Sequence, residues 1–151
     1  SIDDTIENLG GETMSKDKLK LIVAGTRTFN DYPLLEDKLD SYMTYYNVTI
    51  ISGCASGADT LAIKYAKQNN LTLIEKPADW NNLEGIDPKN IKINKYGKPY
   101  NSLAGFERNE EMAKIADALI VFWDGKSKGT ANMIELATKY NLQIQKVIYT
   151  P

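Results

Sequence analysis

The chain of 151 residues contains no histidine and a single cysteine, Cys54, and these two shortages exclude much common catalytic chemistry. Without an imidazole, neither a Ser-His-Asp triad nor a Cys-His nucleophile can be assembled. A thiolate or imidazole metal cage is equally excluded within one chain, although carboxylates could still hold Mg²⁺. We therefore expect no required cofactor and no transition-metal site, and any acid-base chemistry falls to Asp, Glu, Lys or Tyr.

Long apolar runs and an excess of charge of either sign are also missing. The longest apolar run, from Ala118 to Trp123, is far shorter than the roughly 20 residues that a membrane-spanning helix needs. Eighteen basic and twenty acidic residues give a net charge of −2, so no strong overall field attracts nucleic acid or acidic lipid. Together with the lone cysteine, this predicts a cytoplasmic protein with no membrane partner, for which nucleic acid is an unfavoured partner. Any anion site must be built locally.

The composition, with 42% hydrophobic and 25% charged residues, is that of a single globular domain. Residues 1–16 carry few core-forming side chains, and we expect them to form a mobile tail ahead of a domain at 17–151. From Lys18 onward, short apolar runs alternate with amphipathic stretches, which is typical of parallel strands covered by helices. The sequence therefore predicts an α/β fold with an open, mostly parallel five-stranded sheet and helices on both faces.

The expected elements follow from hydrophobic periodicity. Strands are predicted at 19–24, 48–52, 71–74, 118–123 and 144–149. Helices are predicted at 32–46, from Ala58 through the buried stripe that ends at Ala66, at 104–116 and at 130–140. The polar stretch between the third strand and about Leu103 contains three prolines and no periodicity, and it predicts a long functional loop or lid.

Three glycine-bearing loops follow predicted strands, and ligands bind beyond the carboxyl ends of the strands in such sheets. The first loop offers a hydroxyl and a guanidinium, and the other two lead into helix N-termini, where free amides and the helix dipole attract anions. The candidate ligand-binding residues in these loops are Gly25, Thr26, Arg27, Gly53, Ser56, Gly57, Asp59, Asp124, Ser127, Gly129 and Thr130. Each loop alone could be an ordinary turn, and Asp59 could be a first-turn residue favoured by the dipole. Three of them at strand ends of one sheet predict an anion site.

Two further candidates lie outside these loops. Arg108 and Asn109 fall in a glutamate-rich first helical turn, where they are either solvated surface residues or bind the phosphate or base of a ligand. Trp80 lies in the long loop and could close over a ligand, whereas Trp123 ends a core strand and is expected to be buried.

Several motifs occur in a fixed order along the chain. They are Val23–Arg27, Ile51–Asp59, Pro77–Trp80, Gly97-Lys98, Ala104-Gly105, Arg108–Met112 and Phe122–Thr130. With these motifs, the stretch from Lys18 to Tyr149 resembles the SLOG superfamily of Rossmann-like proteins, specifically its YspA or YpsA-related branch. The resemblance implies a Rossmann-like sheet that binds a nucleotide or a nucleotide-derived ligand, and it implies a homo-oligomer, a dimer or higher. Relatives include the Lonely Guy phosphoribohydrolases, the single-strand-binding protein DprA, and sensors of cyclic ADP-ribose-like signals.

The sequence departs from the hydrolase branch of that superfamily at one position. That branch carries Gly-Gly-x-Gly-Thr-x-x-Glu, and catalysis is shared between the glutamate and an upstream arginine. Here Gly129-Thr130 is present, but Met133 stands where the glutamate would be. Glu135, two residues further on, is rotated by about 200° around the helix and cannot replace it. Arg108 matches the upstream arginine.

Three functions remain open. The first is binding of a nucleotide or ADP-ribose-like ligand by a sensor, carrier or sequestering module. The second is N-glycosidic hydrolysis of nucleoside monophosphates or related ribosyl compounds, with Arg108 holding phosphate and Asp124 or Glu107 as the acid-base group, which requires a carboxyl of raised pKa. The third is single-stranded DNA binding through Trp80, Trp123 and the lysines of residues 89–98, against which the net charge argues.

Overall fold

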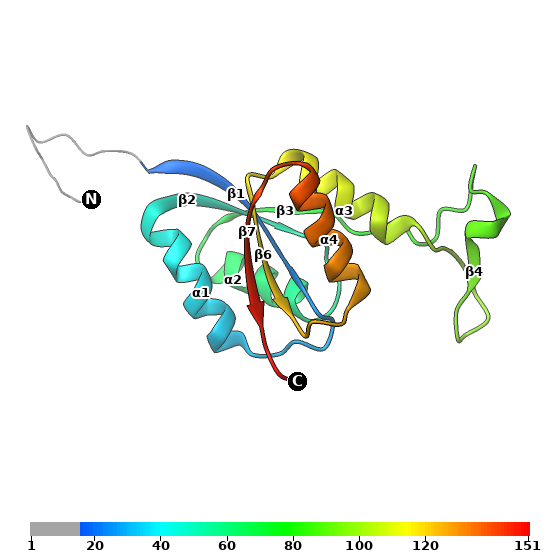
Figure 1. Cartoon of the computed structure of the whole chain (residues 1–151), viewed down its shortest axis with the longest axis horizontal. Helices are drawn as coiled ribbons and strands as arrows, with labels where there is room; N and C mark the ends of the chain where they lie inside the picture. Colours follow the sequence, from blue (N-terminus) through cyan, green and yellow to red (C-terminus); the bar gives the residue numbers. More distant parts are fainter. Residues whose placement is uncertain (1–15) are drawn as a thin grey trace, which may run out of the picture.

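The computed structural model describes residues 16–151, and its centre is a five-stranded sheet with the strand order β3-β2-β1-β6-β7 (Figure 1). The strands are β1 (Asp17–Gly25), β2 (Tyr46–Ser52), β3 (Thr72–Glu75), β6 (Ala118–Trp123) and β7 (Gln143–Ile148). Every pairing in this sheet is parallel. The predicted α/β fold is confirmed and is Rossmann-like. The expected N-terminal tail, apart from Lys16, lies outside the described residues.

The two central strands explain why the sheet forms where it does. Strand β1 pairs with β2 on one side and with β6 on the other, so Ile22 lies beside both Ile51 and Leu119. The five residues Ala118 to Phe122 of β6 are all buried. A strand that is covered on both faces has a continuous run of apolar residues rather than an alternating pattern, and the buried parts of β1 and β6 have such runs.

Four helices cover the two faces of the sheet, as predicted. Helices α1 (Tyr32–Tyr45) and α2 (Ala58–Gln68) lie on one face, and α3 (Ala104–Ile115) and α4 (Lys128–Lys139) lie on the other. Each face has its own apolar cluster, with Leu35 and Leu39 of α1 in the first and Met112 and Met133 in the second. None of the helices between residues 16 and 151 has the length and apolar character that a membrane crossing requires.

Helix α2 approaches the sheet closely because alanines occupy its buried face, at Ala58, Ala62 and Ala66. Tyr65, on the same helix, is fully buried, and its hydroxyl donates a hydrogen bond of 2.6 Å to the carboxylate of Asp40 on α1. This bond ties the two helices of one layer together.

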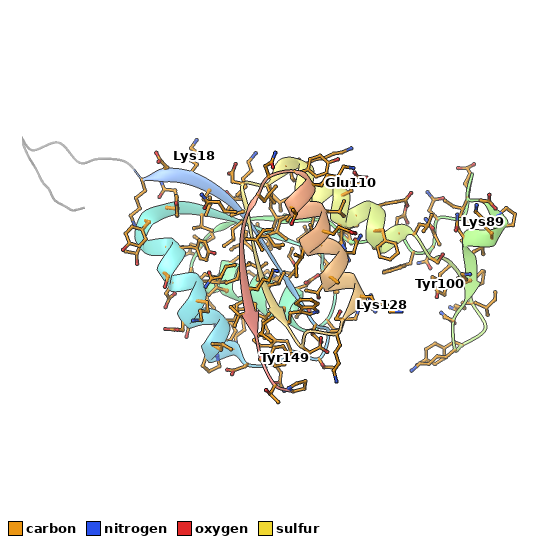
Figure 2. The ribbon with its side chains drawn as sticks, viewed as in Figure 1. Lys18, Lys89, Tyr100, Glu110, Lys128 and Tyr149 are labelled. Carbon is orange, nitrogen blue, oxygen red and sulfur yellow. The ribbon has the colours of Figure 1, made fainter. Side chains whose placement is uncertain are left out.

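The polar stretch before α3 contains a small hairpin that the sequence analysis did not predict. A single 3₁₀ turn, η2 (Pro88–Asn90), precedes β4 (Ile91–Ile93), which pairs antiparallel with β5 (Pro99–Asn101). The hairpin projects from the body beyond the N-terminus of α3 (Figure 1). Lys89 and Tyr100 lie on this projecting segment (Figure 2).

Candidate functional site

A pocket of about 180 Å³ opens at the carboxyl edge of the sheet, where β1 ends. The chain leaves β1 toward β2 and β3 on one side and returns to β6 and β7 on the other, so β1 and β6 flank the point where the strand order reverses. Such a switch point is the usual ligand site of open α/β sheets. Nine of the predicted site residues line the pocket, namely Gly25, Arg27, Asp59, Trp80, Arg108, Asn109, Ser127, Gly129 and Thr130.

Three helices begin at this pocket without a side chain capping their first turn. The N-cap residues are Gly57 for α2, Leu103 for α3 and Ser127 for α4, and none of them forms a side-chain cap bond. Helix α1 is different, because the carboxylate of Asp31 accepts a hydrogen bond from the amide of Leu34 at 3.1 Å. The first amides of a helix have no partner within the helix and carry the positive end of its dipole. Three sets of main-chain donors therefore surround one pocket.

The loop that leads into α4 is held by the carboxylate of Asp124. Its Oδ1 accepts hydrogen bonds from the amides of Ser127, at 2.9 Å, and Lys126, at 2.8 Å, while its own amide donates to the hydroxyl of Thr26 at 3.0 Å. The hydrogen bonds that the main-chain amides of Ser127 and Lys126 donate lower the pKa of Asp124. Asp124 and Thr26 thus brace the end of β6 against the end of β1 and position Ser127, although neither of them lines the pocket.

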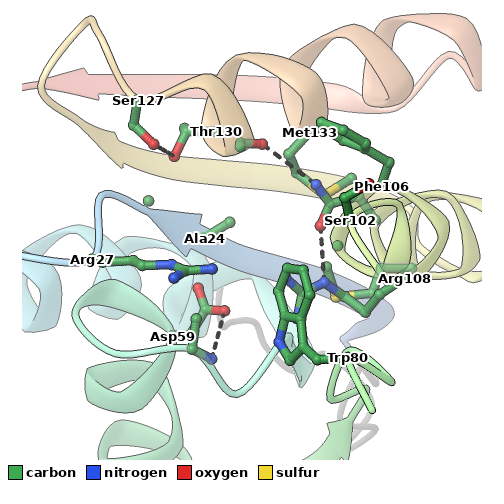
Figure 3. A pocket seen from close by; sticks show the side chains of 16 residues that line it. Ala24, Arg27, Asp59, Trp80, Ser102, Phe106, Arg108, Ser127, Thr130 and Met133 are labelled. Atoms are coloured by element: carbon green, nitrogen blue, oxygen red, sulfur yellow. Dashed lines mark hydrogen bonds between the residues drawn. The ribbon is translucent and has the colours of Figure 1, made fainter. Parts of the chain in front are cut away.

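The loop before α2 rests on the loop that follows β1. Gly57 has a φ of +79°, and a Cβ at this position would collide with the main-chain oxygens of Thr26 and Arg27. Only glycine combines this backbone conformation with so close an approach. The contact places Asp59 beneath Arg27 (Figure 3). Ser56, on the outer side of the loop, is exposed and does not line the pocket.

Arg108 crosses from α3 to the loop after β2. Its Nη1 donates to the main-chain oxygen of Gly53, and its Nε donates to Oδ1 of Asn109 at 3.0 Å. The amide nitrogen of Asn109 in turn donates to Asn132 of α4 at 3.0 Å. Gly53 leaves the space that the guanidinium occupies, because a Cβ there would collide with it and would lie 2.8 Å from Oδ2 of Asp59. Burial lowers the pKa of Arg108.

Asp59 is the buried carboxylate of the pocket, with 6% of its surface exposed. Its Oδ2 accepts a hydrogen bond of 3.1 Å from the amide of Ala55. Burial raises the pKa of Asp59 to about 6, against the opposing influence of that amide and of the charges on Arg108 and Arg27. Within residues 16–151 the ion pairs are formed by lysines and glutamates on α3 and α4 and in the loop after β3, so neither arginine forms an ion pair with Asp59.

Trp80 forms one wall of the pocket. Its ring lies against Gly105, where a Cβ would come within 3.0 Å of Cη2, and the Cζ of Arg27 lies 5.9 Å from its ring centre. Tyr100 of the hairpin packs edge-on against it at 6.2 Å. Trp123 is partly buried, and its indole nitrogen donates to the main-chain oxygen of Ser127 at 3.1 Å. Of the two tryptophans, only Trp80 lines the pocket.

Glu107 and Met133, two residues that the sequence analysis weighed for catalysis, lie in different environments. Glu107 is exposed, accepts a bond of 3.3 Å from Asn101 and does not line the pocket. Met133, at the position of the hydrolase glutamate, is 1% exposed and belongs to the core while also lining the pocket. Sequence reasoning did not assign Gly105 or Phe106, which line the pocket at the start of α3, although Gly105 was part of a matched motif.

Comparison with known proteins finds a family match in the first part of the fold. Residues 19–82, from β1 to the start of the projecting segment, match the family described as "YspA, cpYpsA-related SLOG family". Over this segment, which is less than half of the chain, the sequence is similar to the YspA/YpsA-related SLOG family. The matched segment includes the loops at Gly25 and Gly53, whereas Arg108 and the loop before α4 lie beyond it. No curated protein matches the sequence.

Two solved structures have a fold similar to that of this chain. The DNA processing protein DprA of Streptococcus pneumoniae superposes with a TM-score of 0.63 at 21% identity, over 85% of this chain and 50% of that one. DprA of Helicobacter pylori, described for its single-stranded DNA binding mode, gives a TM-score of 0.58 at 22% identity, over 86% of this chain and 65% of that one. The chain thus spans half of the first protein and just under two thirds of the second. At these identities the likeness establishes the fold alone.

Proposed function

We propose that this chain binds a nucleotide or nucleotide-derived ligand and acts as a sensor, carrier or sequestering module. The observation that carries the proposal is the meeting of three uncapped helix N-termini with two guanidinium groups, those of Arg27 and Arg108, around one pocket. Main-chain amides at a helix start bind phosphate without a basic side chain, and the two guanidinium groups add positive charge to the site. The SLOG family match supports a nucleotide-related ligand.

The volume of the pocket suggests which part of such a ligand it encloses. Pockets that enclose a whole drug-sized ligand measure about 300 Å³ or more. The pocket here measures about 180 Å³, enough for a phosphate and a ribose. The phosphate lies at the start of α4, beside Ser127 and Gly129, and the base extends along the face of Trp80 toward solvent.

The positions of Asp124 and Glu107 do not support the acid-base roles that a hydrolase would require of them. A general acid that protonates a leaving base needs a raised pKa. The pKa of Asp124 is lowered, its carboxylate is engaged with two amides, and Glu107 is exposed outside the pocket. We therefore expect a bound nucleoside monophosphate to be recovered intact by chromatography, and release of free base would instead identify a hydrolase.

Gly129 offers a sharp test of the phosphate position. A Cβ at Gly129 has no atom within 4 Å, so an aspartate there fits the fold and interacts favourably with the helix dipole. Its charge would repel a phosphate at the start of α4. We expect Gly129→Asp to keep or raise the melting temperature but to weaken nucleotide binding at least tenfold, while the isosteric control Gly129→Asn binds like the unchanged protein.

The assay is the rise in melting temperature with a panel of nucleoside monophosphates, diphosphates, ADP-ribose and NAD, because a ligand of the folded state stabilises it. Unphosphorylated nucleosides and a short single-stranded oligonucleotide complete the panel. Equal binding to Gly129→Asp and to the unchanged protein would refute the phosphate position. A panel without any nucleotide effect would refute the proposed function. A shift with the oligonucleotide alone, lost as salt rises, would favour DNA binding.

A further inference from the structure

Asp59 has hydrogen-bonding capacity that the protein itself does not use. One carboxylate oxygen accepts the amide of Ala55, and no other hydrogen-bond donor within residues 16–151 reaches the side chain. Figure 3 shows the carboxyl group beside the pocket, on the same side of β1 as Arg27 and Trp80. Buried polar groups normally have their hydrogen bonds completed, and an ionised carboxylate can accept about four. The remaining acceptor positions are therefore available to a ligand.

The charge of Asp59 restricts which part of a nucleotide can lie against it. An ionised phosphate has no donor to offer the carboxylate oxygens, and direct contact with them would bring two negative charges together. A group with two neighbouring donors would instead satisfy the carboxylate, and the vicinal hydroxyls of ribose are such a group. The phosphate would then lie on the opposite wall, at Ser127, which Figure 3 places across β1 from Asp59, and at Gly129, which also lines the pocket.

We propose that Asp59 accepts hydrogen bonds from the 2′- and 3′-hydroxyls of the ligand's ribose and thereby selects ribonucleotides over 2′-deoxyribonucleotides. This inference rests on the proposed function, because it requires a nucleotide in the pocket. It assigns Asp59 a part in specificity and none in bond breaking.

The ionisation of Asp59 gives the selection a characteristic pH dependence. The charged and titratable groups that face the carboxyl are Arg27 from the loop after β1, Arg108 from α3 and Cys54 from its own loop, with Glu75 of β3 next to Cys54. Burial outweighs the two arginines, so the pKa of Asp59 lies near 6 and the carboxylate is ionised at pH 7.5. Protonation below pH 6 removes the acceptor. Preference for ribose should therefore fall as the pH is lowered from 7.5 to 5.

The experiment compares the 5′-monophosphate that gives the largest melting shift with its 2′-deoxy counterpart, by titration calorimetry at pH 7.5 and pH 5. We expect the ribonucleotide to bind at least tenfold more tightly at pH 7.5 and the ratio to approach one at pH 5. The ratio is the readout because the phosphate titrates equally in both ligands.

Asp59→Asn supplies the second arm, since asparagine has the same shape and its carbonyl oxygen can still accept the amide of Ala55. We expect the variant to lose the preference for ribose while its affinity for the deoxynucleotide stays the same or rises. Asp37→Asn, an exposed position on α1, is the matched control and should keep the full ratio. If Asp59→Asn fails to fold, the affinity ratio of ribonucleotide to deoxyribonucleotide in the unchanged protein, and the pH dependence of that ratio, test the role of Asp59.

The outcomes separate the two proposals. Equal affinity for both nucleotides in the unchanged protein, or a ratio that Asp59→Asn leaves intact, overturns the role of Asp59 while nucleotide binding stands. A ratio that increases toward pH 5 also overturns it. Absence of binding by either nucleotide overturns the proposed function itself.

Discussion

Replacing Asp59 by asparagine should make the ligand-free protein more stable at neutral pH, because the folded state holds this carboxylate charged in a buried position. The pKa of Asp59 rises from its ordinary value of 3.8 to about 6 on folding. Above pH 6 the group is ionised in both the folded and the unfolded chain, and the folded state carries a penalty of about 3 kcal/mol. The neutral amide removes this penalty. For a domain of this size the gain corresponds to about 6 to 12 °C in melting temperature.

The pH dependence tests the cause of this gain. As the pH falls through 6, the folded chain takes up a proton before the unfolded chain does, so the penalty disappears and is only about 0.5 kcal/mol at pH 4. Urea denaturation of both proteins at pH 7.5 and pH 4 measures the difference, and other titrating groups cancel in the comparison. A variant that is less stable than the unchanged protein at pH 7.5, or a difference that does not change with pH, would show that the buried charge carries no such penalty.

Four other substitutions have definite expected results. Gly57→Ala should lower the free energy of unfolding by about 3 kcal/mol or more in urea denaturation, because positive φ and a main-chain collision act together; Gly97→Ala, with a φ of +80° and open space, should cost only about 1 kcal/mol. Tyr65→Phe should lower stability by about 1 to 2 kcal/mol in the same assay, since the buried hydroxyl loses its 2.6 Å bond. Asn109→Ala should weaken nucleotide binding by releasing Nε of Arg108, and calorimetry should find it without further effect in an Arg108→Ala background. An additive loss in the double variant would contradict that link.

The strands and helices of the body could be predicted because each buries a continuous or periodic apolar surface. The run from Ala118 to Trp123 was predicted as a strand and coincides with β6. Helix α4 begins at Lys128 rather than at the predicted Thr130, since nothing in the sequence marks a start that lacks a side-chain cap. The hairpin formed by β4 and β5 was missed because its three-residue strands bury little and leave Ile93 exposed.

The loops of the site could be predicted, but the roles within them could not. Glycine and hydroxyl residues at strand ends pointed to one edge of the sheet, and the structure brings nine of the predicted residues into one pocket. Asp59 and Asp124 look alike in the sequence, since each lies close to a glycine near the start of a helix. The fold gives them opposite environments. Burial raises the pKa of Asp59, whereas hydrogen bonds from main-chain amides lower the pKa of Asp124. Such differences depend on how loops from distant segments meet.

The central position of β1 has a consequence for how the chain folds as it is synthesised. The amide of Lys20 on β1 bonds to the carboxylate of Asp117, 97 positions further along the sequence, where the chain enters β6. Until that distant stretch emerges from the ribosome, one edge of β1, whose residues Leu21 to Ala24 are apolar and buried in the folded protein, remains open to pairing with any other exposed backbone. We therefore expect a chaperone that shields nascent chains to bind residues 17–25. Stalled or truncated products that end before β6 should aggregate.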